Sequence, residues 1–464
     1  MPRLLISAAH KSSGKTMVSL GLVRALRQRG RVVQPFKKGP DYIDPLWLGS
    51  AAGRPCYNLD YNTQDEAAIR ALLARHESSA DLAVIEGTKG LYDGVALDGS
   101  TSNAALARLI EAPVVLVIDC IGMTRGIAPL LAGYRHFEGA PAFAGVILNK
   151  VGGPRHEAKL RAAVETYTDF PVLGAVPKHD AMRVAERHLG LIPSNEQEAA
   201  EAVVEAIAAV VGAHVDLDAI EAAAARVPAL IAPSPAPTPT TSPRVRIAVA
   251  RDSAFGFYYP DDLDDLAAEG AEIVPLDTLH DTALPPDIDG LVIGGGFPET
   301  HMAALEANTA LRSDLRDRLF AGLPCYAECG GLMYLSRSIT WQGQRCAMVG
   351  AVPADTVMHD RPRGRGYVRL RATETAAPWR VDASPDGAIR AHEFHYSALE
   401  SVEALASFAY DVERGDGVDG LHDGLVIGNT VAGYTHMRGN WVRPFMNFVQ
   451  TRAKVPIGEP AGTR

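Results

Sequence analysis

Residues 4–16, LLISAAHKSSGKT, establish the start of an α/β fold. Residues 4–7, of which the first three are apolar, favour a buried β-strand, which runs directly into a turn rich in serine. After the turn, apolar residues at 18, 22, 25 and 26 recur with the spacing of an amphipathic helix. A strand, a glycine-containing loop and a helix in this order form the context of a phosphate-binding P-loop.

The loop is expected to hold ATP. Its backbone N–H groups would point at phosphate oxygens, its lysine would reach the β- and γ-phosphates, and its threonine would bind Mg²⁺. The leading glycine of the motif is absent, since alanines stand at positions 8 and 9, and an ordinary loop that opens a helix is the alternative. The predicted nucleotide contacts are Ser12, Ser13, Gly14, Lys15 and Thr16, with Asn149 at the end of a later strand facing a purine edge or forming a turn.

Carboxylates are expected near this loop. Residues 37–45, KKGPDYIDP, place Asp41 and Asp44 beside two lysines, in a segment whose prolines are expected to exclude a regular helix. Glu86 follows an apolar strand at 82–85, and α/β sheets bind ligands at the carboxyl ends of their strands. Carboxylates near a triphosphate indicate Mg²⁺ binding or substrate positioning, whereas Asx-turns are the structural alternative for the aspartates.

A second candidate site surrounds one cysteine. Residues 323–335, LPCYAECGGLMYL, predict a strand, a sharp turn and a helix, with Cys329 at the turn. A thiolate at a helix N-terminus is favoured by the helix dipole, so Cys329 is a candidate nucleophile. Cys325 on the preceding strand is expected in the core. The remaining cysteines, Cys56, Cys120 and Cys346, receive no role.

The thiol needs a base and an oxyanion site. The glycine turn after the strand at 291–293, together with the turn at the cysteine, is expected to supply oxyanion-binding N–H groups from Gly295, Gly296 and Gly330. His436 ends a predicted strand near the C-terminus, a common place for the base of an α/β domain. His392 and His395 are rivals, and the residues alone leave this choice open.

The organisation of the chain follows from one proline-rich stretch. Residues 228–243, PALIAPSPAPTPTTSP, are expected to form a linker. Predicted strands at 114–118 and 146–148 alternate with helices before it, and the alternation restarts after it. We therefore expect two α/β domains, 1–227 for ATP binding and 244–464 for the cysteine site.

Composition excludes several classes of protein. The 464 residues carry a formal net charge of −10, which argues against nucleic acid or an anionic membrane as partner. The five cysteines without a CxxC pair argue against a disulfide scaffold and a zinc ribbon. With no long apolar run and no signal-peptide pattern, we expect a cytoplasmic location.

Taken together, these motifs resemble the cobyrinate and hydrogenobyrinate a,c-diamide synthase family, which are glutamine-dependent tetrapyrrole amidotransferases. The resemblance covers nearly the whole chain and rests on SSGKT (12–16), FKKGPDYIDP (36–45), GRPCYNLD (53–60), EGTKGLYDG (86–94), LNKVGGPRH (148–156), RHLGLIP (187–193), FGFYYPDDL (255–263), GGGFPE (294–299), YAECGGLMYL (326–335) and HEFHYS (392–397).

The resemblance implies a fold and a set of site residues. The first domain would be a P-loop parallel-sheet domain similar to dethiobiotin synthetase, and the second a class I glutamine amidotransferase α/β domain. Cys329 would be the nucleophile and His436 its base. Other amidotransferases carry a glutamate two residues after this histidine, where Arg438 stands here, so the resemblance implies a Cys–His dyad.

The implied chemistry is ATP-dependent amidation of peripheral acetate groups with L-glutamine as nitrogen donor. ATP would phosphorylate the carboxylate to an acyl phosphate, and channelled ammonia released at Cys329 would displace the phosphate. The expected magnesium ligands are Thr16, Asp41 and Glu86, and the expected substrate contacts are Asp41, Tyr42 and Asp44. The expected partner is a tetrapyrrole, with a homodimer as the candidate assembly.

Some positions depart from the family. The phosphate loop AAHKSSGKT lacks the usual glycine, Leu46 and Trp47 stand where a histidine is typical, and the ending after His436 differs. These departures leave sirohaem or a sirohydrochlorin derivative as alternative substrates. Cobyric acid synthase chemistry is another alternative, and a P-loop ATPase switch with an inactive amidotransferase-like binding domain is an alternative of another class.

Overall fold

The computed structural model describes residues 2–137, 139–182, 184, 186–187, 190–196, 199–228, 244–374, 377–402 and 407–453. The chain divides into two units, Met1–Ala236 and Pro237–Arg464. The predicted linker 228–243 lies outside the described residues except for Pro228. Within the described ranges, no helix combines the length and the apolar character needed to cross a bilayer.

The first unit is built on a seven-stranded parallel sheet in the order β3-β2-β4-β1-β5-β6-β7. Its strands are largely buried, as expected for a parallel sheet covered on both faces. The strands predicted at 4–7, 82–85, 114–118 and 146–148 are all present. The strands are β1 (Arg3–Ala8), β2 (Val33–Lys38), β3 (Tyr57–Leu59), β4 (Leu82–Glu86), β5 (Val114–Asp119), β6 (Phe143–Val151) and β7 (Val172–Pro177), with a small hairpin of β8 (Glu186–Arg187) and β9 (Gly190–Leu191).

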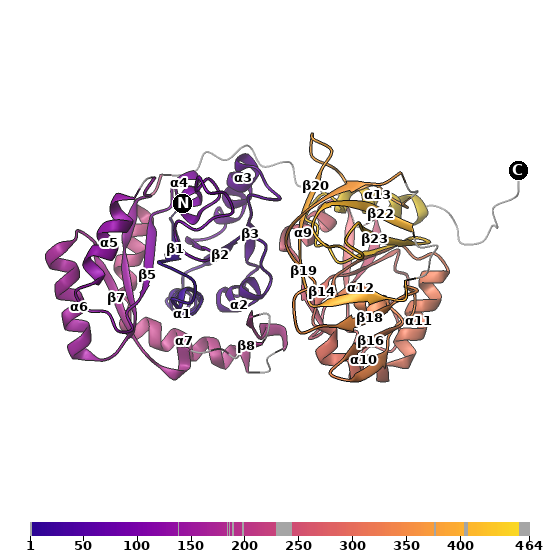
Figure 1. Ribbon diagram of the computed structural model, residues 1–464, viewed down its shortest axis with the longest axis horizontal. Helices are drawn as coiled ribbons and strands as arrows, with labels where there is room; N and C mark the ends of the chain where they lie inside the picture. The colour runs from indigo at the N-terminus through magenta and orange to yellow at the C-terminus, as the bar shows by residue number, and fades with distance from the viewer. Residues whose placement is uncertain are drawn as a thin grey trace, which may run out of the picture. The chain divides into compact units, whose positions relative to one another are not determined.

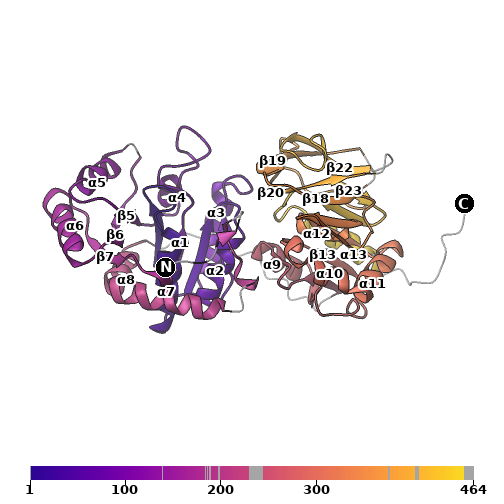
Figure 2. The same ribbon diagram turned by 60° about the horizontal axis from the view of Figure 1, so that its bottom comes forward.

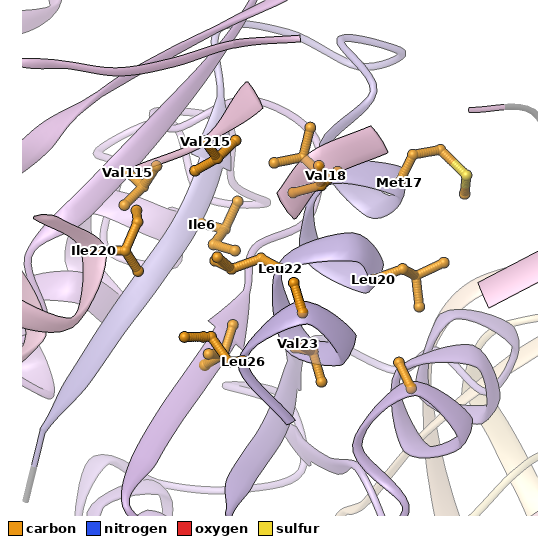
Figure 3. Close-up of a cluster of buried hydrophobic side chains, with 14 of the residues drawn as sticks. Ile6, Met17, Val18, Leu20, Leu22, Val23, Leu26, Val115, Val215 and Ile220 are labelled. Carbon is orange, nitrogen blue, oxygen red and sulfur yellow. The ribbon is translucent and has the colours of Figure 1, made fainter. Parts of the chain in front are cut away.

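Helices cover both faces of this sheet (Figure 1). One apolar cluster joins α1, α2, α7 and α8 to one face, and a second joins α3, α4, α5 and α6 to the other. Figure 3 shows Val18, Leu22 and Leu26 of α1 beside Ile6 of β1 and Val115 of β5. The helices are α1 (Lys15–Gln28), α2 (Ile43–Ala52), α3 (Glu66–Glu77), α4 (Asn103–Leu109), α5 (Ile127–His136), α6 (Pro154–Tyr167), α7 (Ala200–His214) and α8 (Leu217–Ala225).

One expectation in this unit is wrong. The prolines of 37–45 were expected to exclude a regular helix, but α2 begins at Ile43 and contains Asp44 and Pro45 in its first turn. Proline is tolerated there because the first N–H groups of a helix have no intrahelical acceptor. Helix α2 therefore carries Asp44 at its N-terminal end, directly after β2 and a short turn.

The second unit contains a nine-stranded sheet in the order β12-β10-β13-β15-β24-β23-β22-β19-β20. The pairs from β12 to β24 are parallel, and those from β24 to β20 are antiparallel. These strands are β10 (Val245–Ala250), β12 (Ala271–Leu276), β13 (Gly290–Ile293), β15 (Cys325–Glu328), β19 (Gly364–Ala372), β20 (Ile389–His395), β22 (Ser407–Arg414), β23 (His422–Ile427) and β24 (Thr430–Gly433).

Helices lie on both faces of the second sheet as well (Figure 2). α9 (Pro260–Ala268) and α13 (Val442–Ala453) share one apolar cluster, whereas α10 (Met302–Ala307), α11 (Thr309–Phe320) and α12 (Gly330–Leu335) share another. Strands β17 (Gln344–Ala347), β16 (Ser338–Trp341), β18 (Asp355–Met358) and β21 (Ser397–Glu400) form a small sheet, and β11 (Phe255–Phe257) pairs with β14 (Gly295–Gly296). The parallel part brings the ends of β13, β15 and β24 to one edge.

Candidate functional site

The loop between β1 and α1 has the backbone shape of a phosphate-binding loop. Gly14 is the N-cap of α1 with φ +84°, and Ser12 also has a positive φ of 67°. The Ser13 hydroxyl donates to the carbonyl of His10 at 2.8 Å and tightens the turn. A Cβ on Gly14 would lie 2.2 Å from Nδ2 of Asn149, so both backbone conformation and space require glycine here.

Two residues at the end of β6 support this loop. Nδ2 of Asn149 donates to the carbonyl of Ser13 at 2.8 Å. Nζ of Lys150 donates to the carbonyl of Ser12 at 2.9 Å and to Oδ2 of Asp119 at 2.8 Å. The amide nitrogen of Asn149 is thus engaged with the loop.

Glu86 is the centre of the polar groups beside the loop. Its Oε1 accepts from Lys15 at 3.2 Å, from the Thr16 hydroxyl at 2.8 Å and from Lys37 at 2.9 Å. The Thr16 hydroxyl also lies 3.4 Å from Oδ2 of Asp44. Glu86 is fully buried, so its charge is balanced by the two lysines rather than by water.

The two aspartates differ in their surroundings. Asp44 pairs directly with Nζ of Lys37, whereas Oδ2 of Asp41 lies 3.6 Å from that nitrogen. Burial raises the pKa of Asp44, but Lys37 and Lys15 outweigh burial and lower it. Burial and the neighbouring Asp44 raise the pKa of Asp41 to about 6, with Lys37 opposing. Asp44, whose carboxyl has the lower pKa of the two, is also the aspartate that contacts Thr16.

These groups suit a magnesium ion bound together with phosphates. Oε2 of Glu86 is buried and has no hydrogen-bond partner among the described residues, and carboxylate and hydroxyl oxygens are the ligands Mg²⁺ prefers. In the described part of the chain, no cluster of three or more His, Cys, Asp or Glu is arranged to hold a metal. Mg²⁺ in nucleotide sites usually takes one or two carboxylates plus substrate phosphates, which agrees with this arrangement.

Cys329 occupies a strained turn in the second unit. It lies between β15 and α12 with φ +48° and ψ −103°, a backbone conformation that non-glycine residues rarely adopt. Its N–H donates to the carbonyl of Gly433 at 2.8 Å, which fastens the turn to the end of β24. The strand, turn and helix predicted for this segment are present, and Cys325 is fully buried.

His436 lies against Cys329 and against a carboxylate. Its side chain lies beside Cys329, whose sulfur acts on its pKa, and its Nδ1 lies 3.2 Å from Oε2 of Glu328. Burial lowers the pKa of His436, but the Cys329 sulfur and Glu328 outweigh burial and raise it to about 10. Because Nδ1 faces Glu328, Nε2 is the nitrogen left to face the sulfur.

The rival histidines have other surroundings. His392 stacks on His436 with 5.0 Å between ring centroids, and its Nδ1 lies 3.2 Å from the hydroxyl of Tyr259. Burial, helped by the charge of His436, keeps the pKa of His392 well below its usual value. His395 stacks on Tyr434 at 3.9 Å and uses Nδ1 on the carbonyl of Ser397. Both histidines pack around the site, while His436 contacts the sulfur.

The three predicted oxyanion glycines come close to this site. A Cβ on Gly295 would lie 2.6 Å from Cε1 of His436, and one on Gly330 would lie 2.9 Å from the amide nitrogen of Gly296. A Cβ on Gly296 would lie 1.9 Å from the carbonyl oxygen of Ala254. Gly330 opens α12, where N–H groups lack intrahelical acceptors. Glycine at 295 therefore allows the backbone to approach the imidazole of His436, and glycine at 296 and 330 allows the neighbouring backbones to pack closely.

The sequence interpretation missed three residues of these sites. The sequence showed Lys37 and Lys150 only as neighbours of other motifs. In the structure, Lys37 contacts Glu86 and Lys150 contacts the carbonyl of Ser12. Glu328 was overlooked because a third catalytic partner was sought two residues after His436. Its only sequence signal was its place directly before Cys329.

Comparisons with known proteins match each of the two units to a known domain family. Residues 5–192 match the CobQ/CobB/MinD/ParA nucleotide binding domain, and residues 246–440 match the CobB/CobQ-like glutamine amidotransferase domain. A cobyrinate a,c-diamide synthase of Magnetococcus marinus is 46% identical over 443 residues, covering 94% of each chain. The enzyme of the same name from Archaeoglobus fulgidus is 40% identical over 94% of each chain, and that from Methanosarcina acetivorans is 39% identical over 95% of this chain and 93% of its own.

Proposed function

The chain belongs to the cobyrinate a,c-diamide synthase family, and from this membership we propose that it converts the a- and c-carboxylates of cobyrinate to amides. It is a glutamine-dependent ligase with a nucleotide-binding domain and an amidotransferase domain. The observation that carries the proposal is the position of His436 beside Cys329, in a chain that also has a loop of phosphate-binding shape at the start of α1. One centre would release ammonia, and the other would activate the carboxylate that receives it.

Activation is needed because a carboxylate is a poor electrophile. We assign Gly14, the backbone amides of Ser12 and Ser13, and Lys15 to the phosphates of ATP. A carboxylate oxygen of the substrate attacks the γ-phosphorus, ADP leaves, and an acyl phosphate forms. Lys15 and Lys37, which neutralise Glu86 and Asp44 in this structure, are placed to offset the phosphate charge.

Magnesium would be held by Thr16 and Glu86, with Asp41 as the ligand expected from the sequence and Asp44 as the aspartate that contacts Thr16. The ion would neutralise charge on the β- and γ-phosphates when bound. Tyr42 is assigned to the substrate carboxylate, together with whichever of Asp41 and Asp44 does not bind the ion. Asn149 keeps the loop closed through Ser13 and offers Oδ1 to the base.

At the second centre, the Cys329 sulfur attacks the side-chain amide carbon of glutamine. The N–H groups of Gly295, Gly296 and Gly330 are assigned to the developing oxyanion. His436 then passes the proton it holds to the leaving nitrogen, so that ammonia departs and a thioester remains. Water hydrolyses the thioester to glutamate, and the ammonia displaces phosphate from the acyl phosphate.

The test is to incubate the protein with ATP, Mg²⁺ and glutamine labelled at its amide nitrogen, offering cobyrinate, sirohaem and a sirohydrochlorin derivative in separate reactions. Mass spectrometry should find label in two amides of cobyrinate. Label in another tetrapyrrole alone would reassign the substrate. Failure to hydrolyse glutamine under every condition would support the switch with an inactive amidotransferase-like domain.

A further inference from the structure

We infer that Glu328 completes the amidotransferase site as a positioning residue, holding the imidazole of His436 so that Nε2 faces the Cys329 sulfur. The inference rests on the proposed function, because a thiol that hydrolyses glutamine needs an oriented base. It replaces the expected Cys–His dyad by three groups. The third group comes from the nucleophile's own strand rather than from the segment after the histidine.

Both oxygens of Glu328 are engaged. Oε2 faces Nδ1 of His436 at 3.2 Å, while Oε1 accepts the N–H of Met437 at 2.9 Å and the hydroxyl of Tyr326. Glu328 pairs with Gly433 in the register of β15 and β24, three residues before the histidine. The carboxylate is thus fixed by its own strand and by the neighbouring one, and it cannot turn away from His436 without losing the Met437 bond.

The residue at the position where other amidotransferases carry glutamate binds other groups in this chain. Arg438 lies two residues after His436, and its Nε donates to Oδ2 of Asp261 at 2.9 Å. Its guanidinium lies over the ring of Tyr259, 4.8 Å from the centroid, and its side chain is 3% exposed. A cation held there cannot accept from Nδ1, so the acceptor must come from another residue.

The groups around His436 support one orientation of the ring. Besides Cys329 and Glu328, His392 is stacked on the ring of His436. Arg438 and Tyr259 act on His392 rather than on His436 directly, and Asp262 binds Trp441. His392 is held neutral by burial, so it does not compete for the proton. In the inferred arrangement an Nδ1–H would donate to Glu328, and Nε2 would be the nitrogen that takes the proton of the Cys329 thiol during the reaction.

The variant Glu328→Gln separates orientation from packing. Backbone N–H of Met437 is a fixed donor, so the glutamine oxygen is expected to keep that bond and to turn its NH₂ toward Nδ1. Nδ1 must then accept, which places the ring proton on Nε2 and blocks proton transfer from the Cys329 thiol. An equivalent carboxylate-to-amide change in a serine protease triad lowers kcat by about 10⁴-fold through the wrong tautomer.

The experiment measures glutamine-supported and ammonium-supported amidation by the full chain carrying Glu328→Gln, Glu328→Asp or the control Glu413→Gln. Glu413 of β22 bridges Arg369 and Arg371 of β19 and serves as a control glutamate that also has two partners. We expect Glu328→Gln to lower the glutamine-supported kcat by about 10²- to 10⁴-fold with little change in the KM for glutamine. Ammonium-supported kcat and thermal stability should stay close to those of the control.

Two further readouts distinguish positioning from a structural role. Alkylation of Cys329 by iodoacetamide at neutral pH should slow in Glu328→Gln, since the thiolate–imidazolium pair loses its support. Glu328→Asp, which keeps the charge on a shorter side chain, should recover part of the lost kcat. The inference is overturned if Glu328→Gln matches the control in kcat and alkylation, if only KM changes, or if ammonium-supported activity falls in parallel. A parent chain that hydrolyses no glutamine would instead overturn the proposed function and the inference with it.

Discussion

At the scale of single residues, the thiol and the P-loop lysine divide the reaction between them. Cys329 is 6% exposed. Its backbone conformation is strained, and neither packing in the core nor an ordinary turn requires such strain. Lys15 is held on Glu86 in the other unit. Each side chain can therefore be removed to silence one half of the chemistry while the other half reports on folding.

Replacing Cys329 by alanine should abolish glutamine-supported amidation and leave ammonium-supported amidation intact, because the acyl phosphate forms elsewhere. Steady-state rates with glutamine and with ammonium chloride provide the measurement. Cys325→Ala is the matched control, because Cys325 is a buried cysteine on β15, the strand that leads to Cys329. Equal loss with both nitrogen donors would refute the role given to Cys329.

Replacing Lys15 by alanine should lower amidation with either nitrogen donor by about 100- to 1000-fold, the scale of losing one electrostatic donor at a reacting group. Glutamine hydrolysis at Cys329 should persist in part. Phosphate release and glutamate release, measured in the same samples, separate the two effects. Unchanged amidation would exclude Lys15 from phosphate binding.

The raised pKa of His436 predicts a dependence of stability on pH. Its folded-state value is about 10, above the usual 6.5, so the folded chain binds the proton more tightly than the unfolded chain. The stabilisation it supplies is complete below pH 6.5 and is lost as the pH rises through about 10. Urea unfolding of the parent and of His436→Gln should show a gap in free energy of unfolding that shrinks over this window. A gap that grows with pH would contradict the assigned charge.

The sequence could predict Lys15, Thr16 and Cys329 as candidate reacting residues, but it could not predict the place of Glu328. Lys15, Thr16 and Cys329 belong to contiguous motifs, whose local order defines a loop and a turn. The contact of Glu328 with His436 spans 108 residues and depends on the register of two neighbouring strands. No local pattern encodes that register, so a search two residues after the histidine found only Arg438.

At the scale of elements, helix α1 shows how one backbone conformation has different consequences at its two ends. Gly14 at its start has φ +84°, and Gly30 just after its end has φ +82°. A Cβ on Gly14 would collide with Asn149, whereas nothing lies within 4 Å of one on Gly30. The two glycines are therefore matched in strain and differ in contact.

Gly14→Ala and Gly30→Ala should each cost about 1–2 kcal/mol from placing a side chain in the left-handed region. Gly14→Ala should in addition lose ATP binding, because the loop and Asn149 must separate. Thermal unfolding and calorimetric titration with ATP measure the two quantities. ATP binding that survives in Gly14→Ala as well as in Gly30→Ala would argue against the close packing at Asn149.

The elements themselves were largely predictable from periodicity, and the exception is informative. The predicted strands and α1 are present because each buries a continuous apolar pattern. The start of α2 was missed because Pro45 was treated as a helix breaker. Its place in the first turn, where it costs no hydrogen bond, became visible only in the structure.

At the scale of the whole molecule, each unit has its own sheet and its own pair of apolar clusters. Helices cover both faces of each sheet, so neither core depends on the other. The alternation of strands and helices predicted two α/β domains. That alternation could not predict the order of strands in each sheet or the antiparallel extension from β24 to β20, because those pairings join distant segments.

Residues 2–228 and 244–464, produced as separate chains, should each unfold in one cooperative transition. The second chain should hydrolyse glutamine. The first should bind ATP and, given the tetrapyrrole carboxylate and ammonium, form the acyl phosphate and convert it to the amide with release of phosphate. Calorimetry and the two partial assays test this. A second chain that stays unfolded, or that folds without reacting at Cys329, would show that the units need each other.

The adjacency of Glu328 and Cys329 also has an evolutionary consequence. The two residues are encoded by neighbouring codons, so the nucleophile and the carboxylate that orients its base are inherited together. An insertion in any loop between them and His436 shifts neither relative to the other. Position 438 then no longer has to supply the glutamate that orients the histidine, and it can hold an arginine that pairs with Asp261. A sequence search that requires a glutamate at this position would therefore discard a chain whose site has its carboxylate at position 328.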